Sequence, residues 1–101
     1  MIKFTNKELR MIVENFDHIL NSVDTSAIEY AKGLSEECKR NIKQLLCFDD
    51  EILNSDEDIN RILVKTLMEF YSFFVYGFDI PDDEIFMDII EKLRVVKDAA
   101  S

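Results

Sequence analysis

The stretch of sequence that decides the fold is residues 59–78, which read INRILVKTLMEFYSFFVYGF. One apolar face begins at Ile59 and Ile62, and further apolar side chains spread round to the opposite face. A helix that is apolar on most of its circumference is usually the central helix of a bundle. The most apolar part, 62–78, is 17 residues long and carries Lys65 and Glu69, whereas a membrane span needs ~20 apolar residues. We therefore predict a buried central helix and no membrane span.

Helices are also predicted on both sides of this stretch. Thr5 and Glu8 have the S/T-x-x-E spacing of a capping box, which predicts a first helix over about residues 6–22. Pro81 suits the first turn of a last helix over about 81–97. Gly77 suits the end of the central helix that precedes it.

The second predicted helix follows the cap-type residues 24–26 and covers about 22 residues. Its apolar period keeps its phase through Gly33, so we prefer one continuous helix. A break at Gly33, with Ser35 capping a new segment, is the alternative. In the connection 48–58 we expect at most one short turn, around Ile52 and Leu53, and then an N-cap at Ser55.

Composition supports this helical interpretation. Hydrophobic residues make up 48% of the 101 residues, which excludes a disordered chain. Two Gly and one Pro are too few for a fold built on many tight turns. We predict a single all-α domain over 1–101, a compact bundle of four main helices, or five if the chain breaks at Gly33.

Charge is distributed unevenly along the chain. The net charge is -9, yet residues 1–48 contain equal numbers of acids and bases, so the whole excess belongs to residues 49–101. Most of these acids fall in two connections, one before the central helix and one before the last helix: Asp49, Asp50, Glu51, Asp56, Glu57, Asp58, Asp79, Asp82, Asp83 and Glu84. Such surfaces attract a basic protein and disfavour direct contact with nucleic acid. Helix capping and solubility are the alternative reason for these acids.

Two aromatic side chains are candidate anchors for a partner. Six aromatic residues lie between Phe70 and Phe78, and most of them must be core. Tyrosine supplies both apolar area and a hydroxyl at interfaces. Tyr71 and Tyr76 are therefore our candidates, and Tyr76 is the stronger one because an acidic cluster follows it directly.

The sequence does not favour catalysis, a cofactor or a metal site. A calcium loop starting at Asp49 or at Asn54 would lack the Gly at its sixth position and the Glu at its twelfth. His18 has one carboxylate within reach, Glu14, where a metal site needs three or four ligands. Cys38 and Cys47 are too far apart on a helix to form a disulfide, which suits reduced thiols in the cytoplasm. We therefore expect that the protein is not an enzyme.

In its size, helix content and acidic segments, Phe48-Asp49-Asp50-Glu51 and Val75 to Glu84, the chain resembles the small acidic helical immunity proteins that bacteria make against their own nuclease toxins. These include colicin-type and contact-dependent-inhibition systems. The resemblance implies a cytosolic protein that binds one cognate toxin domain. The sequence leaves two alternatives open, namely a helical adaptor or subunit of an oligomer, and a phage-encoded antagonist of a host defence protein. The oligomeric state stays open.

Overall fold

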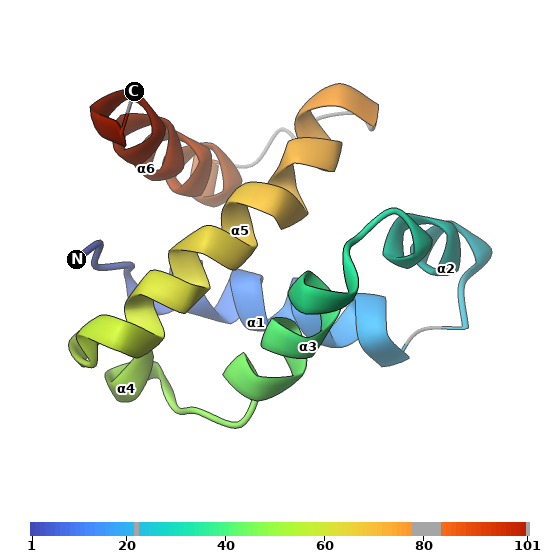
Figure 1. Cartoon of the computed structure of the whole chain (residues 1–101), viewed down its shortest axis with the longest axis horizontal. Helices are drawn as coiled ribbons and strands as arrows, with labels where there is room; N and C mark the ends of the chain where they lie inside the picture. The colour runs from blue at the N-terminus through green and yellow to red at the C-terminus, as the bar shows by residue number, and fades with distance from the viewer. Residues whose placement is uncertain (22, 78–83, 101) are drawn as a thin grey trace.

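The longest helix, α5 (Glu57–Gly77), crosses the computed structural model diagonally, with the other helices arranged around it (Figure 1). The structure describes residues 1–21, 23–77 and 84–100, with side chains for all of these except 73–77 and 99–100. Within these ranges there are six α-helices and no β-strand. The other five are α1 (Asn6–Asn21), α2 (Thr25–Lys32), α3 (Glu36–Leu45), α4 (Asp50–Ser55) and α6 (Glu84–Ala100).

The core lies along α5, as its apolar circumference predicts. The Phe70 ring packs edge to face against Phe16 of α1 at 5.1 Å and against Tyr30 of α2 at 5.2 Å between ring centroids. On the other side, the rings of Tyr71 and Phe86 of α6 lie 5.2 Å apart. The radius of gyration, 12.9 Å, is that of a compact chain of this length. The prediction of a compact all-α fold is confirmed.

The predicted start of α1 is also confirmed. The Glu8 side chain accepts a hydrogen bond from the Thr5 amide at 2.7 Å, and the Thr5 hydroxyl accepts one from the Glu8 amide at 3.1 Å. These two bonds are the reciprocal pair of a capping box. Asp24 caps α2 in turn, because its carboxylate accepts a hydrogen bond from the Ser26 amide at 2.8 Å.

The preferred prediction of one continuous helix through Gly33 is wrong, and the alternative is correct. Ser35 caps α3, accepting a hydrogen bond from the Cys38 amide at 3.1 Å. Glu69 of α5 accepts hydrogen bonds from both the amide and the hydroxyl of Ser35, at 2.8 and 3.0 Å. The apolar period continues in phase because α2 and α3 both pack on the same core. Both the local cap and a contact from a distant part of the chain therefore stabilise the start of α3 after the break.

The segment before α5 contains the short turn predicted around Ile52 and Leu53. This turn is the six-residue helix α4, so the chain has six described helices rather than the four or five main helices predicted. The predicted N-cap at Ser55 is wrong by one residue, because Asp56 accepts the capping hydrogen bond from the Ile59 amide at 3.0 Å. The Ser55 hydroxyl instead donates to the Glu51 carbonyl. The predicted first turn of the last helix, at Pro81, lies outside the described residues.

Candidate functional site

Six acidic side chains lie at the starts of α4 and α5, two helices at the lower left of Figure 1. We call residues 49–58 the acidic corner. Its carboxylates occupy the N-terminal ends of two consecutive helices, and all six are exposed: Asp49, Asp50, Glu51, Asp56, Glu57 and Asp58. There is no basic residue within the segment. Residues 49–58 therefore present an exposed acidic surface at the starts of α4 and α5.

Two of these six acids have a clear structural role. Asp49 accepts a hydrogen bond from the Ile52 amide at 3.0 Å and caps α4, and Asp56 caps α5 in the same way. Carboxylates in the first turn are also favoured by the positive end of the helix dipole. Glu57 lies 3.7 Å from Arg61, a long ion pair between two exposed side chains. Capping by hydrogen bonds thus accounts for two acids, whereas the side chains of Asp50, Glu51 and Asp58 make no capping hydrogen bond within the part of the chain that the structure describes.

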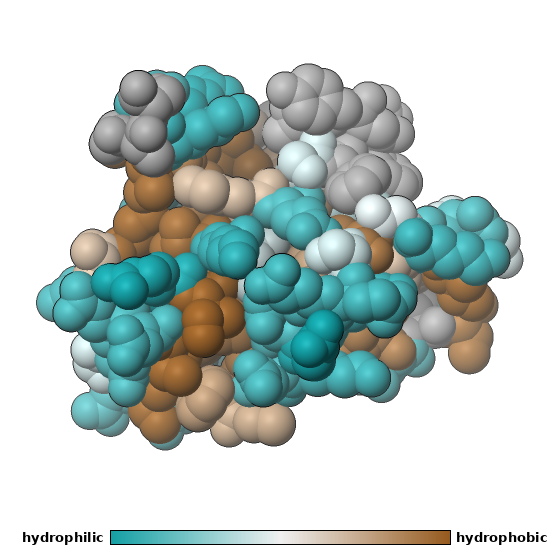
Figure 2. All heavy atoms as spheres, viewed as in Figure 1, coloured by the Kyte–Doolittle hydropathy of each residue, from teal (hydrophilic) through white to brown (hydrophobic). Residues whose placement is uncertain are grey.

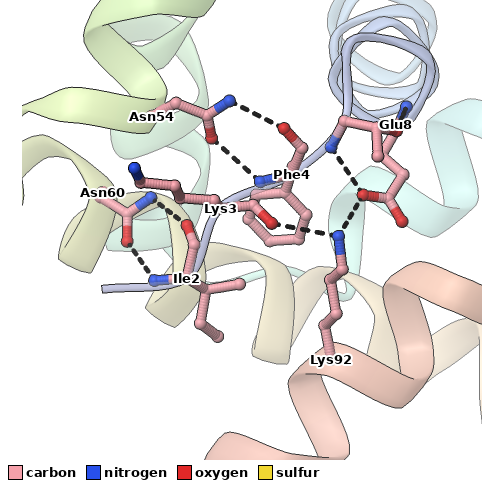
Figure 3. Close-up of polar contacts among 8 residues, drawn as sticks. Ile2, Lys3, Phe4, Glu8, Asn54, Asn60 and Lys92 are labelled. Atoms are coloured by element: carbon pink, nitrogen blue, oxygen red, sulfur yellow. Dashed lines mark hydrogen bonds and ion pairs between the residues drawn. The ribbon is translucent and has the colours of Figure 1, made fainter.

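The acidic corner is held in place by the N-terminal segment (Figure 3). Asn54 of α4 accepts a hydrogen bond from the Phe4 amide at 3.0 Å and donates one to the Phe4 carbonyl at 2.7 Å. Asn60 of α5 makes the same two bonds to Ile2, at 3.1 and 2.7 Å, and donates a third to the Leu53 carbonyl at 2.9 Å. Each asparagine thus satisfies both backbone groups of one residue. We call these two asparagines with residues 2–4 the N-terminal clamp.

The clamp is joined to α6 through Lys92. Its ammonium group donates to the Lys3 carbonyl at 3.0 Å and pairs with Glu8, whose side chain is almost fully buried (Figure 3). It also lies 5.5 Å from the centroid of the buried Phe4 ring, within the range of a cation–π contact. The start of α1, the acidic corner and α6 are therefore connected by one network.

An apolar pocket of about 280 Å³ opens between the end of α3 and the start of α5. It is lined by Gln44, Leu45, Cys47, Phe48, Ile59 and Ile62. Apolar side chains reach the surface in the region between α3 and α5, flanked by polar ones (Figure 2). Asp49 follows Phe48 directly, and Asp58 precedes Ile59. The pocket and the acidic corner are thus neighbours in the chain on two sides.

Tyr71, one of the two predicted anchors, is a core residue. Its side chain is 1% exposed, and its hydroxyl donates to the Asn15 side chain at 2.9 Å. Burial raises the pKa of this hydroxyl. The ring is held between Phe70 and Phe86, so almost none of its surface is exposed. The side chain of Tyr76, the other candidate, lies outside the described residues.

The second acidic connection is described only at Glu84, since Asp79, Asp82 and Asp83 lie outside the described residues. Glu84 is exposed at the start of α6, two residues before Phe86. Phe86 contacts Tyr71 of α5. At 1.5 Å per residue, Tyr71 lies roughly 20 Å along α5 from Asp58. Glu84 and the acidic corner therefore belong to different ends of α5.

A second, larger hollow lies between α5 and α6. This groove of about 520 Å³ has a mainly apolar lining and is bordered by Arg94, Lys97 and Asp98. Arg94 is exposed and lies 3.7 Å from Glu91. The apolar part of the lining comes from Leu67, Met68, Tyr71, Ile90 and Leu93. Unlike the acidic corner, this groove carries basic side chains at its edge.

The remaining candidate residues are His18 with Glu14, and the two cysteines, of which Cys47 lines the pocket between α3 and α5. His18 and Glu14 are exposed on α1. Cys38 is buried and Cys47 is exposed, and both are free thiols. Within the described ranges, no three His, Cys, Asp or Glu side chains are grouped to hold a metal ion. No helix in that part of the chain combines the length and the apolar character that crossing a membrane requires.

Sequence reasoning missed the two asparagines that hold the corner, Asn54 and Asn60. It also missed the ion pair between Glu8 and Lys92 that links this region to α6. The bonds of the two asparagines join positions 50 and 58 residues apart, so no local pattern records them. One weak signal existed, because Asn60 is a polar residue on a helix that is otherwise apolar on most of its circumference. No protein-family model matches the chain, and no curated protein or solved structure is significantly similar to it.

Proposed function

We propose that this protein is an inhibitory binding protein, most concretely an immunity protein or antitoxin that neutralises a basic, nuclease-type toxin domain through its acidic corner. The observation that carries the proposal is the set of six exposed carboxylates at the starts of α4 and α5, in a segment, 49–58, that contains no basic residue. Four of the six are free of any capping hydrogen bond in the contacts described above. The function needs no catalytic group, cofactor or metal.

The physical basis is electrostatic complementarity. A dense set of carboxylates attracts a basic surface, increases the association rate and makes binding sensitive to salt. A nuclease domain is basic where it binds phosphates, so the corner would present carboxylates at positions that phosphates otherwise occupy. The N-terminal clamp supports this role, because Asn54 and Asn60 hold both helices of the corner to one backbone segment. A partner then meets a preorganised surface, which lowers the entropic cost of binding.

The test separates charge from folding by keeping the capping residues Asp49 and Asp56. In the triple variant Asp50→Asn, Glu51→Gln, Asp58→Asn, each side chain keeps its size and loses its charge. The partner captured from the source cell is purified, and its affinity is measured at about 50 mM and about 500 mM NaCl. We expect the variant to bind at least about tenfold more weakly at low salt, and the affinity of the wild-type protein to fall steeply with salt.

The matched control removes the same number of charges elsewhere. Glu14→Gln, Asp17→Asn, Glu29→Gln changes three exposed acids on α1 and α2, and it should leave binding nearly unchanged. Co-expression with the captured partner should also relieve its toxicity. An affinity that is flat in salt and equal for both triple variants would rule out this function. A captured host defence protein in place of a toxin would favour the phage antagonist instead.

The groove between α5 and α6 favours a second candidate, a helical adaptor or subunit of an oligomer. An exposed hollow with an apolar lining is a common site for a partner helix, and Met87 and Val95 are exposed apolar residues on α6. Sedimentation of the isolated chain distinguishes the two candidates. Self-association that survives high salt would favour the adaptor, and a monomer at every salt concentration would count against it.

A further inference from the structure

The pocket between α3 and α5 has the size and lining of a socket for one side chain. Leu45 is almost fully buried, whereas Phe48, Ile59 and Ile62 are half-buried and so remain partly open to solvent. An apolar cavity of ~150 Å³ binds benzene, so about 280 Å³ is enough for one aromatic ring or branched aliphatic group. The lining offers little for a polar ligand beyond Gln44.

The charges around the pocket define what can approach it. On one side Phe48 leads directly into Asp49 and Asp50, and on the other Asp58 lies one helical turn before Ile62. These carboxylates are exposed. The exposed bases nearest in sequence are Lys43 on α3 and Arg61 on α5, of which Arg61 lies 3.7 Å from Glu57. An apolar group that enters the pocket is thus flanked by an excess of negative charge.

We infer that this pocket is an anchor site, which takes one aromatic or branched aliphatic side chain of a basic partner segment while flanking Lys or Arg residues pair with Asp49, Asp50 and Asp58. The inference rests on the proposed function, because it assigns a role to a pocket beside the same acidic corner. The anchor site would also explain how the protein selects one basic partner among many. Carboxylates steer any basic protein, whereas a buried anchor at the centre of an interface selects one.

Cys47 provides a direct chemical probe of the pocket. Its thiol lies in the lining and is exposed, so a maleimide can reach it. Cys38 is protected by burial, which together with Glu69 raises the pKa of its thiol to about 12, and thiols react through the thiolate. N-ethylmaleimide at neutral pH should therefore modify the folded protein once, at Cys47, and fill part of the pocket.

The experiment uses the full chain and two short labelled peptides. Both carry the same Lys and Arg residues on each side of a central position, which is Phe in one peptide and Ala in the other. Binding is measured by fluorescence anisotropy at low salt. We expect the Phe peptide to bind at least about tenfold more tightly, as the burial of a large apolar side chain predicts. N-ethylmaleimide should remove this preference in the wild-type protein. In a Cys47→Ser variant, the same treatment should leave the affinity for each peptide at its value before treatment, whatever that value is.

The outcomes separate the two levels of the proposal. Equal binding of both peptides would overturn the anchor site and leave the acidic surface standing, whereas failure of both peptides to bind would overturn the two together. A Phe preference that survives modification of Cys47 would overturn the assignment of the pocket. Self-association of the chain that the modification abolishes would make a second copy the occupant, which also overturns the inference.

Discussion

The two ends of α5 are stabilised by different kinds of contact. At the N-terminal end, the acidic corner is held by directional hydrogen bonds, from the helix caps and from Asn54 and Asn60 to residues 2–4. Toward the C-terminal end, contact with α6 is made by rings and aliphatic side chains, with Tyr71 packed edge to face on Phe86. The charges differ as well, since the first end is acidic and the groove beside the second is bordered by Arg94 and Lys97.

This difference shows that a net charge of -9 does not describe any one surface of the protein. Acids collect where helices begin, because the dipole and the free amides favour them there, and bases collect near the end of α6. A polar clamp fixes geometry more narrowly than apolar packing does, since hydrogen bonds weaken steeply with angle. The end with the clamp is therefore the one suited to a defined docking surface.

The largest expected effect is at the apolar end. Phe86→Ala removes a side chain that is 2% exposed and should lower the free energy of unfolding by ~4 kcal/mol. Urea denaturation measures the loss, and hydrogen exchange should show increased opening of α6 before the acidic corner. Met87→Ala is the matched control, since Met87 is 46% exposed and should cost under ~0.5 kcal/mol. Equal losses for the two variants would contradict the packing described for this end.

The next effect concerns the clamp. Asn60→Ala removes three hydrogen bonds from a side chain that is 1% exposed, and it leaves buried backbone groups without partners. We expect a loss of ~3 kcal/mol, with faster hydrogen exchange at the Ile2 amide and in α4. Asn21→Ala is the control, because Asn21 is exposed and its side chain donates a hydrogen bond to the exposed Asp17 on the same helix. If exchange increased in α6 rather than at Ile2, the clamp would not be the element that fixes the corner.

The smallest effect lies between the two ends, at Cys38. Its thiol packs beneath α5 with its pKa raised by burial, so it stays protonated in the folded state while the unfolded chain loses this proton above about pH 8.5. Because the pKa is higher in the folded than in the unfolded state, the thiol contributes its full stabilisation below about pH 8.5. This contribution to the free energy of unfolding decreases as the pH rises toward 12. Between about pH 8 and about pH 10 we expect a loss of ~2 kcal/mol in the free energy of unfolding.

Two variants isolate the contribution of this thiol. In Cys38→Ala, the free energy of unfolding should change less between these pH values, whatever its value at neutral pH. Cys47→Ser should keep the full slope, since Cys47 is exposed. Tyr30 and Tyr71, whose pKa values burial also raises, contribute mainly at higher pH because tyrosine ordinarily titrates near pH 10. A slope unchanged in Cys38→Ala would show that another group titrates.

Local sequence patterns predicted elements where the causes are local. The Thr5 and Glu8 capping box and the apolar circumference of α5 both depend on residues within a few turns, and both predictions are confirmed. The break at Gly33 was assigned the wrong preference because its stabilising partner, Glu69, is 34 residues away from Ser35. The sequence makes Tyr71 a candidate anchor, although its side chain is buried in the core. The number of aromatic rings that a core can hold depends on how the helices pack, which the order of residues along one helix does not reveal.

By itself, the sequence determined that the chain is helical, that α5 is central and that the excess negative charge lies after residue 48. These follow from periodicity, capping chemistry and counting, which act over short distances. Only the tertiary structure decided that one acidic connection forms a corner clamped by residues 2–4, that a pocket lies beside it, and that Glu84 belongs to the other end of α5. Contacts between residues 50 or more positions apart carry no local signature, because they depend on which helix faces meet when the core is buried.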